Sequence, residues 1–229
     1  MIKIIYIEQP REGYNREYWS RRWRMHGAFA MQFREFWDPV RLYVQNDCVA
    51  DCSAFPGADA DFGGVGELHY TDLASCHASL ATPNMPAIMD DGSQVFARKK
   101  AVHLVTEAKD LIGTRPAAVR VFAWASRPDG MDQAEFRARL DESFAASAKA
   151  FPAPPAHMGI AHNVEPRGAH ESVMDFSFHT MDEAVKGHAA WAAAAAQDPF
   201  LADALGRDPL KVVTHACIVY DMANFGGDE

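Results

Sequence analysis

Short apolar runs alternate with amphipathic segments along the chain. The runs at residues 2–7 and 119–124 are rich in β-branched and aromatic residues, which predicts β-strands. Between them, large apolar side chains from Trp19 to Trp37 recur at spacings of three and four, so we expect one buried face of a helix there. Asn15 comes just before this stripe and is a favourable N-cap residue, so the helix should begin at that point.

The order of the predicted elements occurs twice. An offset of 117 relates Asn46 to Asn163 (163 − 46 = 117), each in a segment typical of a second strand. Further along, an offset of 108 relates Glu67 to Asp175 (175 − 67 = 108), because the loop before the third strand is shorter in the second half. A helix and a closing strand follow in each half. The other predicted helices are 72–80, 133–149 and 181–196, and the later strands are 65–70, 101–106, 173–178 and 212–220.

Strand, helix, strand, strand, helix, strand is the order of a ferredoxin-like βαββαβ unit. Helices cover one face of its sheet, and the other face must be buried. We therefore predict an α+β chain in which two tandem ferredoxin-like units form one intramolecular α/β barrel. The first unit should span 1–112 and the second 117–223, with a Gly- and Pro-containing junction at 111–116.

Composition excludes several classes of function. The net charge of −9 argues against a nucleic-acid partner, because phosphate binding needs a basic surface. No apolar run is long enough to span a bilayer, and the first residues are too promptly charged for a signal peptide, so we expect a cytoplasmic protein with no membrane partner. Only the tail at 226–229 is typical of disorder.

No metal site is expected from the cysteines or histidines. The four cysteines are isolated thiols by their spacing: Cys48, Cys52, Cys76 and Cys217. The histidines of the second half, His188 among them, lack the spacing of a metal centre.

The first long helix carries the candidate chemistry. His26 lies in its apolar stripe, where a histidine is either a core residue with one hydrogen bond or a proton-transfer group. Arg22 borders the stripe beside Tyr18 and could hold a carboxylate through two hydrogen bonds. We expect the neighbouring Arg21 and Arg24 to point to solvent.

The equivalent helix of the second half offers only Phe136, Leu140, Phe144 and Ser147 along its stripe. Because copies with the same structural duty should keep the same residue types, this difference predicts a site in the first half alone.

Two strands add further candidates. Alternation places Glu67 and His69 on one face of the third strand, where a desolvated carboxylate could act as an acid or base, or could simply accept structural hydrogen bonds. Tyr43 is in phase with Gln45 and Asp47 on the second strand and is either an oxyanion-stabilising donor or a core residue.

The first half resembles the EthD-like family of the dimeric α/β-barrel superfamily over nearly all of residues 1–108. The residues that carry the likeness are Trp19, Trp23 and His26, the segment Tyr43-Val44-Gln45-Asn46, and the segment Gly64-Val65-Gly66-Glu67-Leu68-His69. The family's second strand often continues into a histidine after the asparagine, and Asp47 stands in that place here.

The resemblance implies a pocket for a small organic substrate in a superfamily that includes isomerases, polyketide cyclases and decarboxylases, small monooxygenases and haem-binding proteins. From it we predict a cofactor-independent isomerase acting on an unsaturated acid or ester from aromatic-compound catabolism. The alternatives are a cyclase, decarboxylase or cofactor-free monooxygenase, or a non-catalytic ligand-binding protein. A homodimer is compatible with each.

The predicted roles follow. The proton-transfer candidates are His26 and Glu67, the oxyanion-stabilising candidates are Tyr43 and His69, and the substrate-binding candidates are Arg22, Trp19, Trp23, Tyr18, Asn46 and Asp47.

Overall fold

The computed structural model describes residues 1–97, 99–113, 117–165 and 168–221, and the side chains of 216–219 and 221 are left out of the description. It is an α+β protein whose paired strands run antiparallel, and its contacts divide it into two compact units. The first unit comprises Met1–Ala50, Asp61–Val105 and residues 217–221. The second comprises Asp51–Ala60 and Thr106–Ala216. The tail at 226–229 and part of the predicted junction lie outside the described residues.

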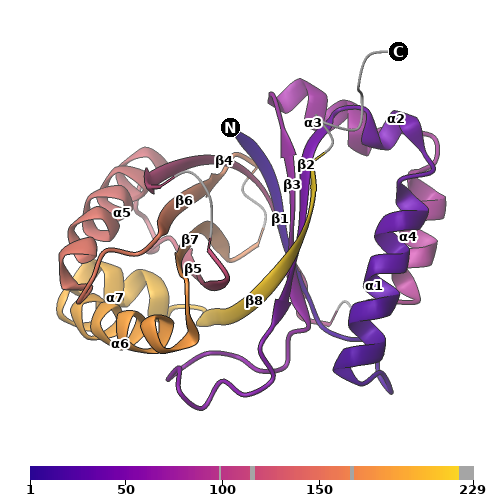
Figure 1. Ribbon diagram of the computed structural model, residues 1–229. Helices are drawn as coiled ribbons and strands as arrows, with labels where there is room; N and C mark the ends of the chain where they lie inside the picture. Colours follow the sequence, from indigo (N-terminus) through magenta and orange to yellow (C-terminus); the bar gives the residue numbers. More distant parts are fainter. Residues whose placement is uncertain (98, 114–116, 166–167, 222–229) are drawn as a thin grey trace. The chain divides into compact units, whose positions relative to one another are not determined.

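The elements that begin in the first half of the chain are β1 (Ile2–Glu8), α1 (Arg16–Ala30), α2 (Arg34–Trp37), β2 (Val40–Cys48), β3 (Gly64–Tyr70), α3 (Leu73–Leu80), α4 (Met85–Ser93) and β4 (Val102–Ile112) (Figure 1). Strand β3 pairs with β1 on one side and with β2 on the other. Helices α1 and α4 lie side by side in this unit.

The elements of the second half are β5 (Val119–Ser126), α5 (Gln133–Ser147), the short 3-10 helix η1 (Ala148–Ala150), β6 (His157–Asn163), β7 (His170–Phe178), α6 (Met181–Gln197), α7 (Pro199–Gly206) and β8 (Leu210–Asp221). Strand β5 pairs with β8 and β7, β7 pairs with β6, and β6 pairs with the later part of β4. The predicted order of strands and helices is therefore confirmed in both halves.

The first residues of corresponding helices and strands in the two halves differ by the offsets found in the sequence. At 117, the first residues of β1, α1 and β2 fall on those of β5, α5 and β6 (2, 16 and 40 become 119, 133 and 157). At 108, those of α3 and β4 fall on those of α6 and β8 (73 and 102 become 181 and 210). The N-caps correspond as well: Asn15 and Asp132 each accept a backbone N–H hydrogen bond through the side chain.

The helix predicted to carry the stripe from Trp19 to Trp37 is divided, because α1 ends at Ala30 and α2 is a separate helix, and two further helices, α4 and α7, were not predicted. Each is short, so it shows few turns of apolar periodicity in the sequence. The predicted halves 1–112 and 117–223 stay a prediction. By contacts, the loop at Asp51–Ala60 and the part of β4 from Thr106 on belong to the second unit. Among the described helices, none is long and apolar enough to cross a membrane.

Candidate functional site

Helix α1 supplies the apolar wall of the site. Its N-cap is Asn15, whose side chain accepts from the Tyr18 amide, and this fixes the phase of the helix. As predicted, Trp19 and Trp23 are buried, and their rings lie 4.9 Å apart. They pack on the face of β1 and β3 that carries Ile4, Tyr6, Leu68 and Tyr70.

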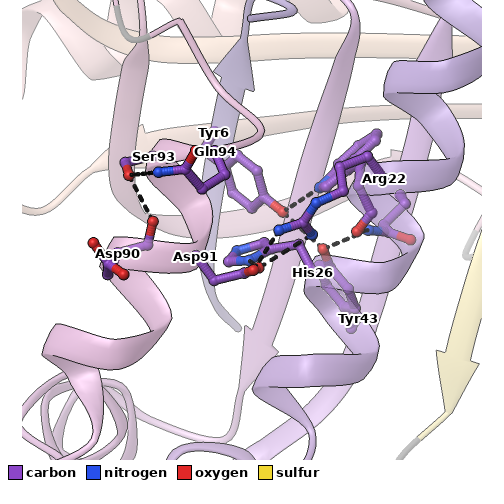
Figure 2. A network of polar contacts seen from close by, with 10 residues as sticks. Tyr6, Arg22, His26, Tyr43, Asp90, Asp91, Ser93 and Gln94 are labelled. Atoms are coloured by element: carbon purple, nitrogen blue, oxygen red, sulfur yellow. Dashed lines mark hydrogen bonds and ion pairs between the residues drawn. The ribbon is translucent and has the colours of Figure 1, made fainter.

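His26 and Arg22 of α1 both bind Asp91 of α4 (Figure 2). The Nδ1 atom of His26 lies 2.7 Å from Oδ2 of Asp91. Arg22 donates from Nη1 to the same oxygen at 3.3 Å and from Nη2 to Oδ1. The ring of Phe96 meets that of His26 edge-on at 5.4 Å. The three polar side chains are 13–21% exposed, so solvent reaches them only in part.

Asp91 is held as a carboxylate. Partial burial acts to raise its pKa, but the hydrogen bonds and charges of Arg22 and His26 outweigh burial, and the pKa lies below the usual value. A carboxylate can only accept, so His26 donates its Nδ1 hydrogen to it. When the imidazole is neutral, its lone pair is then on Nε2, the arrangement of an oriented general base.

A buried pair of tyrosines lies near the cluster of Arg22, His26 and Asp91 (Figure 2). The hydroxyls of Tyr6 and Tyr43 are 2.8 Å apart. Trp23 donates its indole N–H to Tyr6 at 3.3 Å, and Gln45 donates its amide to Tyr43 at 2.8 Å. Tyr6 also packs on the ring of Phe96, at 6.4 Å, so Phe96 touches both this pair and His26.

Both tyrosines stay protonated at neutral pH. Burial is the main cause that raises the pKa of Tyr43 to about 12, and burial together with Tyr43 raises that of Tyr6 well above its ordinary value. The two hydroxyls share one hydrogen bond, and their other recorded partners are donors. One hydroxyl hydrogen is therefore left without an acceptor among the described residues and could bind a ligand oxygen.

Two glycines make room for these rings. A Cβ atom on Gly66 would lie 2.1 Å from the Tyr6 ring, far inside van der Waals contact. One on Gly27 would lie 3.2 Å from Tyr43. Small residues on β3 and α1 thus allow the bulky tyrosines between sheet and helix.

The other predicted catalytic residues lie on the opposite face of the sheet. Glu67 is 2% exposed and binds Asn46 at 3.1 Å and Lys3 at 3.4 Å. His69 Nε2 lies 3.6 Å from the same carboxylate. Strand alternation separates these groups from Tyr43 and His26, so the structure gathers the predicted set into two clusters.

Arg24 was wrongly expected to point to solvent. It binds Asp47 through both oxygens, at 3.2 and 2.5 Å, and Ser20 donates to the same carboxylate at 3.0 Å. The reason is that Asp47, in phase with Tyr43, faces α1 across from Arg24. Arg21 is exposed as predicted, whereas Tyr18, placed among the substrate-binding candidates, is 52% exposed.

Sequence reasoning missed Asp91, Tyr6 and Gln45 as parts of the site. Asp91 lies in an unpredicted helix, so nothing local marked it. Tyr6 could have been found, because it shares a face of β1 with Ile4 while Gly66, a glycine inside a strand, indicates a close approach.

Within the described residues, no group of three or more His, Cys, Asp or Glu side chains could hold a metal ion. His188, the histidine weighed for haem, lies in the second unit and is 0% exposed, with the rings of Phe55 and Trp191 at 5.4 and 6.3 Å. An axial ligand needs open space beside a ring nitrogen, so these residues do not fit haem.

No family model matches the sequence, and no curated protein matches it. Solved structures are similar in fold. An anthrone oxidase-like protein superposes with a TM-score of 0.59 at 11% identity, covering 96% of this chain and 92% of that one. A candidate monooxygenase from Fusobacterium nucleatum subsp. nucleatum gives 0.52 at 9% identity, covering 96% and 94%. A chlorite dismutase variant from Candidatus Nitrospira defluvii gives 0.54 at 11%, covering 94% and 92%.

At such low identities the likeness shows the fold alone. The chain has the fold of dimeric α/β-barrel proteins, as predicted. The narrower resemblance to the EthD-like family stays a prediction.

Proposed function

We propose that this chain is a monooxygenase that needs no bound cofactor and oxidises a small aromatic substrate at an activated carbon. The observation that carries the proposal is the 2.7 Å contact between His26 and Asp91 beside an aromatic wall. A base of this kind can remove a proton from a C–H group that a neighbouring carbonyl or phenol makes acidic.

The two hydroxyls of Tyr6 and Tyr43 complete the first step. Removing the proton moves negative charge to the oxygen conjugated with the reacting carbon. Their spare O–H hydrogen can donate to that oxygen, and because both pKa values are raised the donor does not ionise at neutral pH.

The overall reaction balances with O₂ as the only co-substrate. The carbanion reduces O₂ and bonds to one of its atoms, and the peroxide anion takes up the proton held by His26. Loss of water from the hydroperoxide then converts the CH₂ group to a ketone. One oxygen atom stays in the product and the other leaves in water.

Two further observations favour this reaction over the predicted isomerisation of an acid. Both terminal nitrogens of Arg22 already bind Asp91, so binding a substrate carboxylate would have to break that ion pair. Among the structures of similar fold, two carry names of oxygen-using enzymes, a monooxygenase and an anthrone oxidase-like protein. The first point favours a neutral substrate, and the second favours an oxidation.

Isomerisation by proton transfer is the second candidate, since the pair of His26 and Asp91 would serve it equally well. It shares the deprotonation step and differs in needing no oxygen. Oxygen dependence therefore separates the two.

The test measures O₂ uptake and product formation with anthrone as the probe, in air and under nitrogen. We expect turnover in air that stops under nitrogen, one labelled oxygen atom in the product from ¹⁸O₂, and a loss of about 10²-fold or more in His26→Ala. Equal turnover of a conjugated ketone under nitrogen would favour the isomerase. Unchanged turnover in His26→Ala would overturn both.

A further inference from the structure

A hollow in the second unit lies where the first unit has two aromatic side chains. Its volume is about 150 Å³. The lining residues come from the segment before β6, the end of β7 and the start of α6: Pro152, Ala153, Pro154, Ala156, Phe178, His179, Glu183, Lys186 and Gly187. A cavity of this size holds about one benzene ring.

The corresponding corner of the first unit is filled. There α2 places Phe36 and Trp37 before β2, and both are buried, with rings 5.3 Å apart. Ser79 of α3 holds them by donating its hydroxyl to the Phe36 carbonyl at 2.6 Å, and the hydroxyls of Ser79 and Tyr70 are 3.3 Å apart.

The repeat offsets relate the residues of this corner to residues that line the hollow. At the offset of 117, Phe36 and Trp37 correspond to Ala153 and Pro154. At the offset of 108, Tyr70 and Ser79 correspond to Phe178 and Gly187. All four counterparts line the hollow.

Loss of the two large side chains therefore accounts for the empty volume. Ala153 and Pro154 are exposed, so the hollow opens to solvent, whereas the equivalent positions of the first unit are covered.

The mouth carries one cationic side chain, Lys186, that a ligand can reach. The Oε2 atom of Glu183 already accepts from two backbone amides, those of His179 and Thr180, each at 3.1 Å. Lys186 binds only the exposed Asp182 across one helical turn, a weak surface pair that can open. The Lys186 ammonium can therefore leave Asp182 and pair with a ligand anion.

We propose that this hollow binds a small aromatic carboxylate, with its ring in place of the missing Phe36 and Trp37 side chains and its carboxylate towards Lys186. The site lies outside the machinery of the proposed oxidation, and its test does not depend on that activity.

The test titrates the full chain with benzoate, followed by amide chemical shifts. We expect saturable shifts at Ala156, Lys186 and Gly187, with a Kd on the order of 1 mM for a single ring in a small pocket. Ala153→Phe restores the side chain of the first unit and should weaken binding at least about tenfold. The matched control Ala138→Phe adds the same ring on the exposed face of α5 and should leave binding unchanged.

Lys186→Gln removes the positive charge at the mouth and leaves the buried core unchanged. It therefore separates the contribution of the charge to binding from that of the ring. We expect benzoate to bind about threefold more weakly to it, while phenol binds equally to both proteins. Tighter binding of benzylamine than of benzoate would overturn the charge assignment. Benzoate shifts elsewhere in the chain, or shifts that persist in a folded Ala153→Phe, would overturn the site.

Discussion

At the scale of single residues, one carboxylate organises the site. Asp91 binds both His26 and Arg22, and it does so from a short helix that has no counterpart of similar chemistry in the repeat. At the offset of 108 its position falls on Pro199. The oriented base therefore belongs to the first half alone, in line with the asymmetry that the α1 stripe predicts.

Asp91→Asn should lower kcat by about 10²-fold, because His26 loses the acceptor that fixes its tautomer. The acid limb of the pH–rate profile should also move to lower pH, since the imidazolium form loses a neighbouring negative charge. Asp90→Asn is the matched control, because Asp90 is exposed and adjacent. Equal loss in both variants, or an unmoved acid limb, would contradict the role of Asp91.

Tyr43→Phe should reduce kcat by about tenfold to a hundredfold through loss of the hydroxyl donor. Its cost in unfolding free energy should stay near about 1 kcal/mol, because Gln45 keeps its second hydrogen bond, to the Trp23 carbonyl at 3.2 Å. Steady-state kinetics and chemical denaturation on the same sample separate the two effects. A large fall in stability with unchanged kcat would make Tyr43 a core residue only.

At the scale of elements, periodicity predicts the long helices and the strand order because burial of one face leaves a repeating signal. Asn15, for example, marks the start of α1 correctly. What the pattern cannot supply is the relative phase of neighbouring strands. Alternation places Glu67 with His69 and Tyr43 with Asp47, but only the register of β2 against β3 shows that these pairs face opposite ways.

Asp91 could not be predicted for a different reason. The helix that carries it is nine residues long and begins near a proline, so it has little periodicity of its own. Its approach to α1 is a tertiary contact between segments 65 positions apart, as the pairing of His26 with Asp91 records. Helix-to-helix packing of this kind has no local signature.

Helix α6 holds a histidine that should make stability depend on pH. His188 is fully buried, neither ring nitrogen has a recorded partner, and burial lowers its pKa from 6.5 to about 4, with the charge of Lys211 adding to the effect. Between these values the unfolded chain binds a proton that the folded chain does not. Acid therefore weakens folding as the pH falls from 6.5 towards 4.

His188→Leu should remove this contribution, worth on the order of 2 kcal/mol at pH 4 relative to pH 7. Thermal unfolding followed from pH 7 to pH 4 should show a shallower loss of stability in the variant than in the wild-type chain. The control His77→Leu changes an exposed histidine and should keep the wild-type slope. Parallel curves for His188→Leu and the wild type would show that His188 takes up protons in the folded state.

At the scale of the whole chain, the two units share more than the order of their elements. On the helix-free face of one sheet Lys3 pairs with Glu67, and on that of the other Arg120 pairs with Asp175. The offsets relate both partners (3 + 117 = 120; 67 + 108 = 175), and each pair crosses its sheet on the same diagonal, two residues from the direct partner. The predicted tandem duplication would leave an acid and a base at equivalent positions of both halves in this way, and it stays a prediction.

On the helix-covered face, the units differ by an exchange of side-chain size. Tyr6 lies directly opposite Gly66 in one sheet, and at the same offsets Ala123 lies opposite Met174 in the other. A large residue on one strand meets a small one on its partner in both cases, in reversed positions. If the units descend from one ancestral sheet, the two pairs should be interchangeable as pairs and not as single residues.

A double-mutant cycle tests this. Gly66→Met alone should lower the unfolding free energy by about 3 kcal/mol, because its Cβ meets the Tyr6 ring, and Tyr6→Ala alone by about 3–5 kcal/mol through the cavity it leaves. Together they recreate the pair of the second unit, so the double variant should be at least about 2 kcal/mol more stable than additivity allows. Pairing Tyr6→Ala with Gly206→Ala, where an added Cβ meets nothing within 4 Å, should be additive within about 0.5 kcal/mol. A coupling that small in the Tyr6 and Gly66 cycle would mean that the halves share their element order without sharing their packing.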